Sequence, residues 1–128
     1  MKVVGDVMSR NLLTVERDTS LVDASAAMTA RHVGAALVVA DGRLIGIITE
    51  RDVLRAAGTG DIGGNVGEWM THHPEAVDAD ESTQQAGLVM IHGGFRHLPV
   101  LVAGAPVGIV SIRDLMRVAL DDVTPRGV

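Results

Sequence analysis

Two short polar clusters carry the residue types that could bind a small ligand. In each, a hydroxyl residue stands three positions before an aspartate: Thr49 before Asp52, and Ser111 before Asp114. Each cluster follows an apolar run of strand length and precedes apolar residues at helical spacing, which predicts a helix N-terminus. Free N–H groups, a hydroxyl and a carboxylate can converge there on one small polar target. A carboxylate with two acceptor oxygens suits the vicinal hydroxyls of a ribose.

The same two clusters also fit a purely structural role. A Thr or Ser at the N-cap accepts a backbone N–H three residues on, and an acidic residue at that third position reaches back to the N-cap. This capping box is common, and a single copy would favour it over a ligand site. Both roles can hold at once, so the residues alone leave the two interpretations open.

The polar clusters are part of a repeat that runs along the whole chain. Gly46 and Gly108 open the two copies of the pattern Gly-x-x-[Thr/Ser]-x-x-Asp, which sets an offset of 62 positions. The same offset aligns Asp6-Val7-Met8 with Glu68-Trp69-Met70. Two copies are too few for a solenoid, which usually needs three or more. The repeat therefore predicts a pseudo-twofold pair of small units.

The length of 128 residues permits one compact domain or two very small ones. A unit of about 60 residues would bury too little surface to be stable alone, so the two units are expected to share a core. We place the first unit at residues 1–60 and the second at 61–128, with a glycine-rich linker at about 58–65. Because the chain has one Phe, one Trp and no Tyr, its core is expected to be aliphatic.

Composition argues against several classes of function. The formal net charge of −5 disfavours a nucleic-acid partner, and the lack of cysteine excludes disulfides and thiolate catalysis. The five histidines are not spaced as a metal set, and no catalytic motif is found, so neither a metal nor a catalytic residue is expected. No apolar run approaches the roughly 20 residues of a membrane span, and the first residues do not resemble a signal peptide. We expect a cytoplasmic protein with no membrane partner.

Hydrophobic spacing predicts the order strand, helix, strand, strand, helix in each unit. In the first unit, these elements are expected at residues 12–15, 21–31, 36–40, 44–49 and 51–57. In the second unit, they are expected at 75–77, 82–92, 97–102, 106–111 and 113–120. Asp41-Gly42 is typical of a type I′ hairpin turn. Pro99 cannot donate to a strand ladder, so we expect it at a sheet edge or a bulge.

This succession of motifs resembles a tandem pair of cystathionine-beta-synthase (CBS) domains, the Bateman module. The resemblance rests on the paired openings at positions 6–8 and 68–70, on Leu98-Pro99-Val100, and on both Gly-x-x-[Thr/Ser]-x-x-Asp patterns. It covers nearly everything from Val4 to Leu120. It implies an α/β fold in which two pseudo-twofold related β-α-β-β-α CBS units form one compact module.

The resemblance also implies two clefts between the units, where adenosine-containing ligands bind. By resemblance, Asp52 and Asp114 would hold ribose hydroxyls, with Thr49 and Ser111 near the ribose or the phosphate. The implied contacts to the base are Thr14, Val15, Ala36, Ala76, Val77, Leu98 and Pro99.

The implied phosphate contacts are Arg96 and His97, which come directly before the Leu98-Pro99-Val100 strand. An arginine offers a planar fork that matches phosphate oxygens. The equivalent residues of the first unit are Gly34 and Ala35, so basic phosphate contacts come from one unit only. Occupation of both clefts, or binding of a triphosphate, is therefore in doubt. The alternative roles are a solvated loop arginine and a hydrogen-bonded strand histidine.

The resulting functional prediction is a non-enzymatic regulatory or sensor module that binds an adenosine-containing nucleotide of the AMP, ADP or ATP type. The nucleotide would be a regulatory ligand, and no obligatory cofactor is expected. The alternatives are a sensor of S-adenosylmethionine or NADH, and a dimerisation or interaction module with vestigial clefts. An enzyme is the weakest hypothesis, because the repeats leave no room for a catalytic domain.

A homodimer is expected through the last helix of each unit, as the resemblance implies, together with an unidentified regulated protein. These helices carry apolar residues on more than one face, and an apolar face left on the outside usually marks an interface. The alternative is that Leu54 and Met116 complete the core of the monomer.

Overall fold

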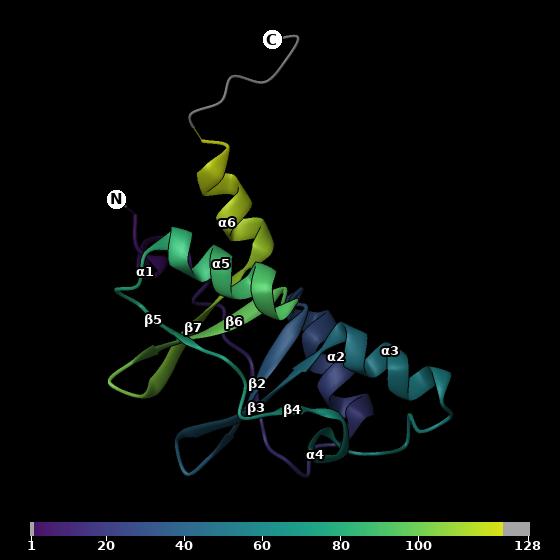
Figure 1. Cartoon of the computed structure of the whole chain (residues 1–128). Coiled ribbons are helices and arrows are strands. Elements are labelled where there is room, and N and C mark those ends of the chain that lie inside the picture. Colours follow the sequence, from purple (N-terminus) through teal and green to yellow (C-terminus); the bar gives the residue numbers. More distant parts are fainter. Residues whose placement is uncertain (1, 122–128) are drawn as a thin grey trace, which may run out of the picture.

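The computed structural model describes residues 2–121, which form two small sheets with helices around them (Figure 1). The first half contains α1 (Val4–Val7), β1 (Thr14–Val15), α2 (Leu21–Arg31), β2 (Ala35–Ala40), β3 (Arg43–Thr49) and α3 (Glu50–Gly58). The second half contains α4 (Val66–Trp69), β4 (Thr71–His72), β5 (Val77–Asp78), α5 (Thr83–Gly93), β6 (His97–Val102), β7 (Ala105–Ser111) and α6 (Ile112–Ala119). The predicted β-α-β-β-α order is confirmed in both halves.

The strands form one sheet per unit, and the two sheets match closely. The first has the order β1-β2-β3-β4 and the second the order β5-β6-β7. β1 and β5 run parallel to their neighbours β2 and β6, while the β2–β3 and β6–β7 pairs are antiparallel hairpins. The β2–β3 turn has a positive φ at both Asp41 (52°) and Gly42 (74°), as a type I′ turn requires.

Pro99 does not lie at a sheet edge, because β6 is the middle strand of its sheet. The counterpart of Pro99 is Leu37, whose N–H donates to the carbonyl of Leu13 at 2.9 Å. Proline lacks that donor. The pairing of β5 with β6 accordingly begins one position later, at Val77 and Val100, beside a register shift between Val100 and Leu101. A bulge thus follows Pro99, but the first unit has the same register shift between Val38 and Val39 without a proline, so Pro99 is not its cause. The expected edge is not present.

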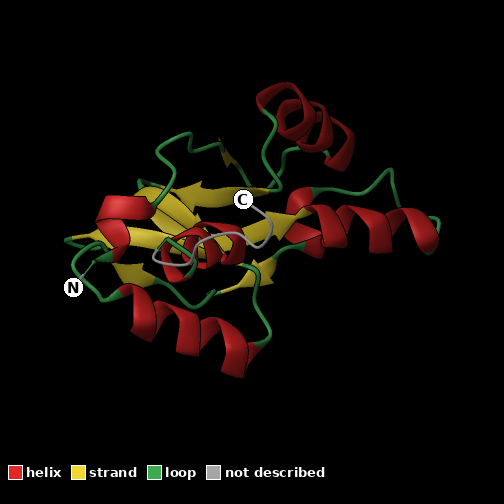
Figure 2. Cartoon of the chain, turned by 90° about the horizontal axis from the view of Figure 1, so that it is seen from above, coloured by secondary structure: helices red, strands yellow, loops and turns green. Residues whose placement is uncertain are grey.

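The central strands are buried on both faces, which explains their continuous apolar sequence. Val38 and Ile48 point into the core beneath α2 and α3. Leu37 and Ile47 point the other way and pack in a third cluster that includes Ile109 of the other unit. Period-two alternation thus divides each strand between its own helices and the opposite sheet. Figure 2 shows the strands gathered in the middle with helices outside them.

The opening segment of each unit packs on the other unit. The Val4 N–H donates to the carbonyl of Glu81 at 2.8 Å, and Ser9 forms a bridge with Ile109 of β7. Val4 belongs to the second core, and α1 lies beside α5 and α6 in Figure 1. In the same way Val66 belongs to the first core, and β4 pairs with β3. Each unit is therefore completed by a segment from the other half of the chain, and the boundary between residues 60 and 61 stays a prediction from the sequence.

This exchange explains the glycine that opens the Gly-x-x-[Thr/Ser]-x-x-Asp pattern. A Cβ added to Gly46 would lie 2.5 Å from Sδ of Met70, and one added to Gly108 would lie 2.6 Å from Sδ of Met8. The exchanged segment therefore reaches the strand backbone only where no side chain intervenes.

Within residues 2–121, no helix is long and apolar enough to cross a membrane. In that same part of the chain, no three His, Asp or Glu side chains are grouped as a metal site would require.

Candidate functional site: two clefts between the units

Two clefts lie between the units, and each combines a helix start from one unit with the loop before a strand of the other. The large cleft has a volume of about 780 Å³ and joins Ser111 and Asp114 to residues 32–35. The small cleft has a volume of about 220 Å³ and joins Thr49 and Asp52 to residues 94–97. The structure thus brings all six residues predicted to meet ribose or phosphate to these clefts, although it holds no ligand that would test their roles.

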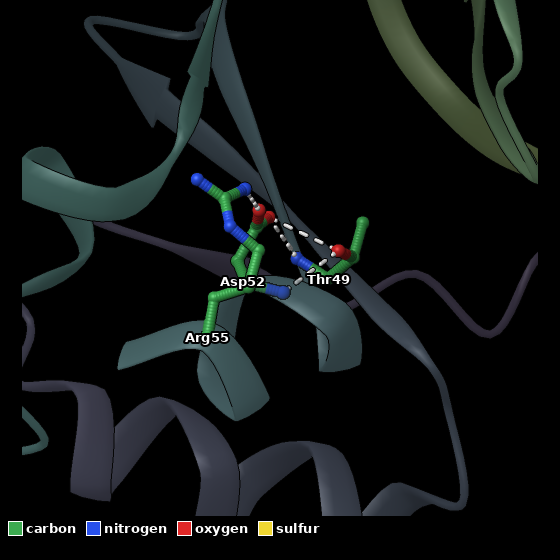
Figure 3. A network of polar contacts seen from close by, with 3 residues as sticks. All are labelled: Thr49, Asp52 and Arg55. Atoms are coloured by element: carbon green, nitrogen blue, oxygen red, sulfur yellow. Dashed lines mark hydrogen bonds and ion pairs between the residues drawn. The ribbon is translucent and has the colours of Figure 1, made fainter. Parts of the chain in front are cut away.

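Asp52 caps α3, and both of its carboxylate oxygens accept hydrogen bonds from neighbouring residues (Figure 3). Its Oδ2 accepts from the backbone N–H of Thr49 at 2.9 Å and from the Thr49 hydroxyl at 3.0 Å. Its Oδ1 accepts from the guanidinium of Arg55 at 3.3 Å. Only 5% of the residue is exposed, so few acceptor positions are open to a ligand.

Further contacts hold Arg55 in place beside Asp52. The Arg55 guanidinium lies 5.8 Å from the ring centroid of Trp69, within cation–π range. The indole N–H of Trp69 donates in turn to Asp61 at 2.7 Å. The counterpart of Trp69 in the other unit is Val7, which can supply neither contact. This network therefore belongs to the small cleft alone.

Asp114 also closes a capping box, but its second oxygen is freer. Its Oδ2 accepts from the Ser111 N–H at 2.8 Å, and Ser111 Oγ accepts from the Asp114 N–H at 3.1 Å. Arg117 is 3.9 Å from Oδ1, too far for a hydrogen bond. The Asp114 side chain is 18% exposed, against 8% for Asp52. Capping is thus present in both units, and the large cleft leaves more of its carboxylate accessible.

Glu50, Arg96 and His97 line both clefts and so mark the place where the two meet. Burial lowers the pKa of His97 below its ordinary value of about 6.5, while the carboxylates of Glu50 and Asp114 act in the opposite direction. The Arg96 guanidinium adds to the lowering of the His97 pKa. His97 is therefore a neutral donor and acceptor near neutral pH, and Arg96 carries the permanent positive charge.

The residues expected to contact the base are not brought to either cleft. Val15 and Ala36 belong to the first core, Val77 and Leu98 to the second, and Pro99 is also buried. Thr14 and Ala76 likewise lie outside the lining of both clefts. Most of these side chains point toward their own unit's helices, because neighbouring strand residues alternate between the two faces.

Several cleft residues were missed by the sequence interpretation. Ile47 and Thr71 line the small cleft, and their counterparts Ile109 and Ser9 line the large one. Ile47 lies two positions before Thr49 on one strand, so strand alternation could have placed both on the cleft face. Ser9 and Thr71 reach the clefts through the exchange of opening segments, for which the sequence carries no local signal.

The clefts differ in charge as well as in size. Three arginines and two carboxylates line the large cleft. Three arginines face three carboxylates in the small cleft. The large cleft is therefore the better environment for an anionic group.

Comparison with known proteins supports the repeat seen in the sequence. The model of the CBS domain family matches twice, at residues 4–58 and 66–121. An uncharacterized 17.7 kDa protein of Acidianus ambivalens is 36% identical over 92% of this chain and 73% of its own length. The chain spans a smaller share of some other curated relatives, 43% of one from Methanocaldococcus jannaschii and 63% of one from Arabidopsis thaliana.

Solved structures of similar proteins have the same fold. A putative signal-transduction protein with CBS domains from Burkholderia ambifaria has a TM-score of 0.90 and 29% identity, and the match covers 99% of this chain and 100% of that one. CBSX2 of Arabidopsis thaliana, crystallised in complex with AMP, has a TM-score of 0.83 and 29% identity, covering 94% and 98% of the two chains. The predicted pseudo-twofold α/β architecture is thereby confirmed.

Proposed function

The chain belongs to the CBS-domain family as a tandem pair, and on this basis we propose that it is a regulatory module that binds one adenosine nucleotide in its large cleft. CBS-domain proteins are generally regulatory, non-catalytic modules. The observation that carries the proposal is the meeting of Asp114 and Ser111 with Arg96 and His97 around one cleft. The carboxylate suits ribose hydroxyls, and the guanidinium suits a phosphate.

The size of the two clefts supports binding of one ligand per chain. Sites for small molecules usually have volumes of roughly 300–1,000 Å³. The large cleft, at about 780 Å³, falls within this range, and the small one, at about 220 Å³, falls below it. The complex of the relative CBSX2 with AMP is consistent with a nucleotide of this class. The cytoplasmic location and the regulated partner protein stay predictions from the sequence.

A thermal-shift panel with adenosine, AMP, ADP, ATP, S-adenosylmethionine and NADH tests this proposal. A ligand that binds only the folded state at about 100 times its dissociation constant adds roughly 2.7 kcal/mol to the free energy of unfolding. A rise in melting temperature with an adenosine nucleotide, and a stoichiometry of one by calorimetry, are the expected results. No shift with any of the six at millimolar concentration would instead support the interaction module with vestigial clefts.

We also propose that α3 and α6 form the contact surface of a homodimer. Leu54 of α3 is 72% exposed, and Met116 of α6 is 49% exposed. The alternative in which these two side chains complete the monomer core therefore has no support from their burial. A twofold partner would present the same two helices, which gives a self-complementary contact.

Light scattering tests the dimer directly. The wild-type chain should run as a dimer at tens of micromolar, and the double variant Leu54→Glu, Met116→Glu should be a folded monomer. The matched control is Val22→Glu, which places a charge on an exposed valine of α2 instead. A wild-type monomer, or a double variant that stays dimeric, would contradict the proposal.

A further inference from the structure

One carboxylate lies where the two clefts meet and has no counterpart in the other unit. Glu50 is the first residue of α3 and lines both the large and the small cleft. Its counterpart 62 positions on is Ile112, the first residue of α6. The junction therefore has a negative group on one side only, just as it has basic groups on one side only.

The Glu50 carboxylate lies close to Gly34 of the first unit. A Cβ added to Gly34 would lie 3.3 Å from Oε1 of Glu50 and 3.4 Å from Nε2 of His97. The counterpart of Gly34 is Arg96, the residue proposed to meet the phosphate. At the place where pseudo-symmetry would put a second arginine, the structure has a carboxylate beside an imidazole. The Glu50 N–H is tied to the Gly34 carbonyl at 3.0 Å, which holds the start of α3 in this place.

We propose that Glu50 is a specificity-determining residue that selects adenosine ligands with few phosphates over a triphosphate. The proposal rests on the proposed function and names the ligand charge that the same site accepts. Arg96 can pair with one phosphate group through its planar fork. Each further phosphate at this junction adds negative oxygens close to Glu50, where Gly34 stands in place of the arginine that pseudo-symmetry would supply. Like charges that lie close together near a protein surface repel, because the effective dielectric constant there is well below that of bulk water.

A role for Glu50 that has nothing to do with ligands makes a different prediction. An acidic residue in the first turn of a helix is favourable to the macrodipole. If that were its entire role, removing the charge would lower the melting temperature slightly and leave the ratio of ligand affinities unchanged. The affinity ratio therefore separates the two roles.

Calorimetric titration of adenosine, AMP, ADP and ATP, with EDTA present so that phosphate charge is not masked by metal, provides the test. Wild type should bind AMP at least tenfold more tightly than ATP. Glu50→Gln should reduce that ratio about tenfold, while its affinity for adenosine changes less than twofold. The matched control is Glu16→Gln, which removes an equal charge from an exposed loop outside both clefts. Equal ratios in wild type, Glu50→Gln and Glu16→Gln would overturn the proposal, as would a wild-type preference for ATP.

A second variant, Glu50→Ile, copies the residue that the other unit has at this position, and melting curves of both variants verify folding. Loss of AMP selectivity in either folded variant supports the role of Glu50. The failure of this inference is distinguishable from failure of the proposed function. If wild type binds none of the four ligands, the proposed function fails and takes the inference with it. If wild type binds them and the ratios do not respond to Glu50, only the inference fails.

Discussion

The large and small clefts are built from equivalent backbone, yet they offer a ligand very different surroundings. In both, a capping box holds an aspartate at the start of a helix. In the small cleft, Arg55 occupies the second oxygen of Asp52, and Trp69 supports that arginine. In the large cleft, the equivalent oxygen of Asp114 has no hydrogen bond from Arg117 at 3.9 Å. The two units of the repeat have equivalent backbones, and the two clefts differ because a few side chains differ.

The two clefts also differ in volume because of their side chains. Phe95 lines the small cleft, and its counterpart Val33 lines the large one. A ring in place of an isopropyl group fills space that a ligand would need. Identical secondary structure therefore does not imply identical binding, and each cleft has to be judged from its own side chains.

The largest expected effect is a difference in ligand affinity between variants of the two aspartates. Asp114→Asn removes the charge that would accept from ribose hydroxyls, and a hydrogen bond to a charged group is worth about 1.5–3 kcal/mol. Ligand affinity should therefore fall roughly ten- to a hundredfold. Asp52→Asn should leave affinity nearly unchanged and lower the free energy of unfolding by about 0.5–2 kcal/mol, the range for a lost cap.

Calorimetry for binding and urea denaturation for stability measure both variants. Equal losses of affinity in the two variants would show that both clefts take part in binding. If Asp114→Asn lowers stability without lowering affinity, Asp114 caps the helix and does not bind the ligand.

The second prediction concerns the feature in which the units are alike. Gly46→Ala and Gly108→Ala should each destabilise the protein by about 1–3 kcal/mol, because the added methyl group overlaps an exchanged segment. Gly108→Ala is expected to cost somewhat more. Its Cβ would lie 2.8 Å from the backbone oxygen of Ser9, whereas the Gly46 Cβ would lie 3.0 Å from that of Thr71.

Denaturant titration of the two glycine variants gives both values. The control is Gly58→Ala, because a Cβ at Gly58 would meet no atom within 4 Å. If Gly46→Ala and Gly108→Ala are no less stable than this control, the exchange does not require the close approach seen here.

The smallest effect is a pH dependence that one unit has and the other lacks, since the counterpart of His97 is Ala35. Burial lowers the pKa of His97, so the unfolded chain binds a proton at a higher pH than the folded chain. The contribution of His97 to stability is then complete above about pH 6.5 and declines as the pH falls toward the folded pKa. Melting temperature should drop across this window more in wild type than in His97→Gln.

Ligand binding should shift the pKa of His97 in the opposite direction to burial. A bound phosphate favours the charged imidazole, so it should raise the pKa of His97 and draw a proton from solution. Calorimetry in two buffers of different ionisation enthalpy would reveal this uptake. Identical apparent enthalpies in both buffers would exclude protonation on binding.

Much of the architecture could be predicted from the sequence because it depends on local patterns and on their repetition. Alternation and helical spacing fixed the element order, the pair Thr49 and Asp52 predicted a cap that the structure contains, and Asp41-Gly42 predicted its turn. The offset of 62 positions revealed the internal symmetry. Pro99 was partly misjudged, because its missing N–H shortens a neighbouring strand pair without moving Pro99 to an edge.

The cleft linings were decided only by tertiary structure, because they depend on how the two units meet. Nothing near Val4 or Val66 in the sequence indicates that each packs into the core of the other unit. Likewise, no sequence pattern around Glu50 indicates a role in a cleft. Only the packing of the two units brings its carboxylate beside Gly34 and His97. Local patterns determine which face of an element is apolar. Which side chains share a cleft depends on contacts between residues far apart along the chain, and no local pattern encodes these.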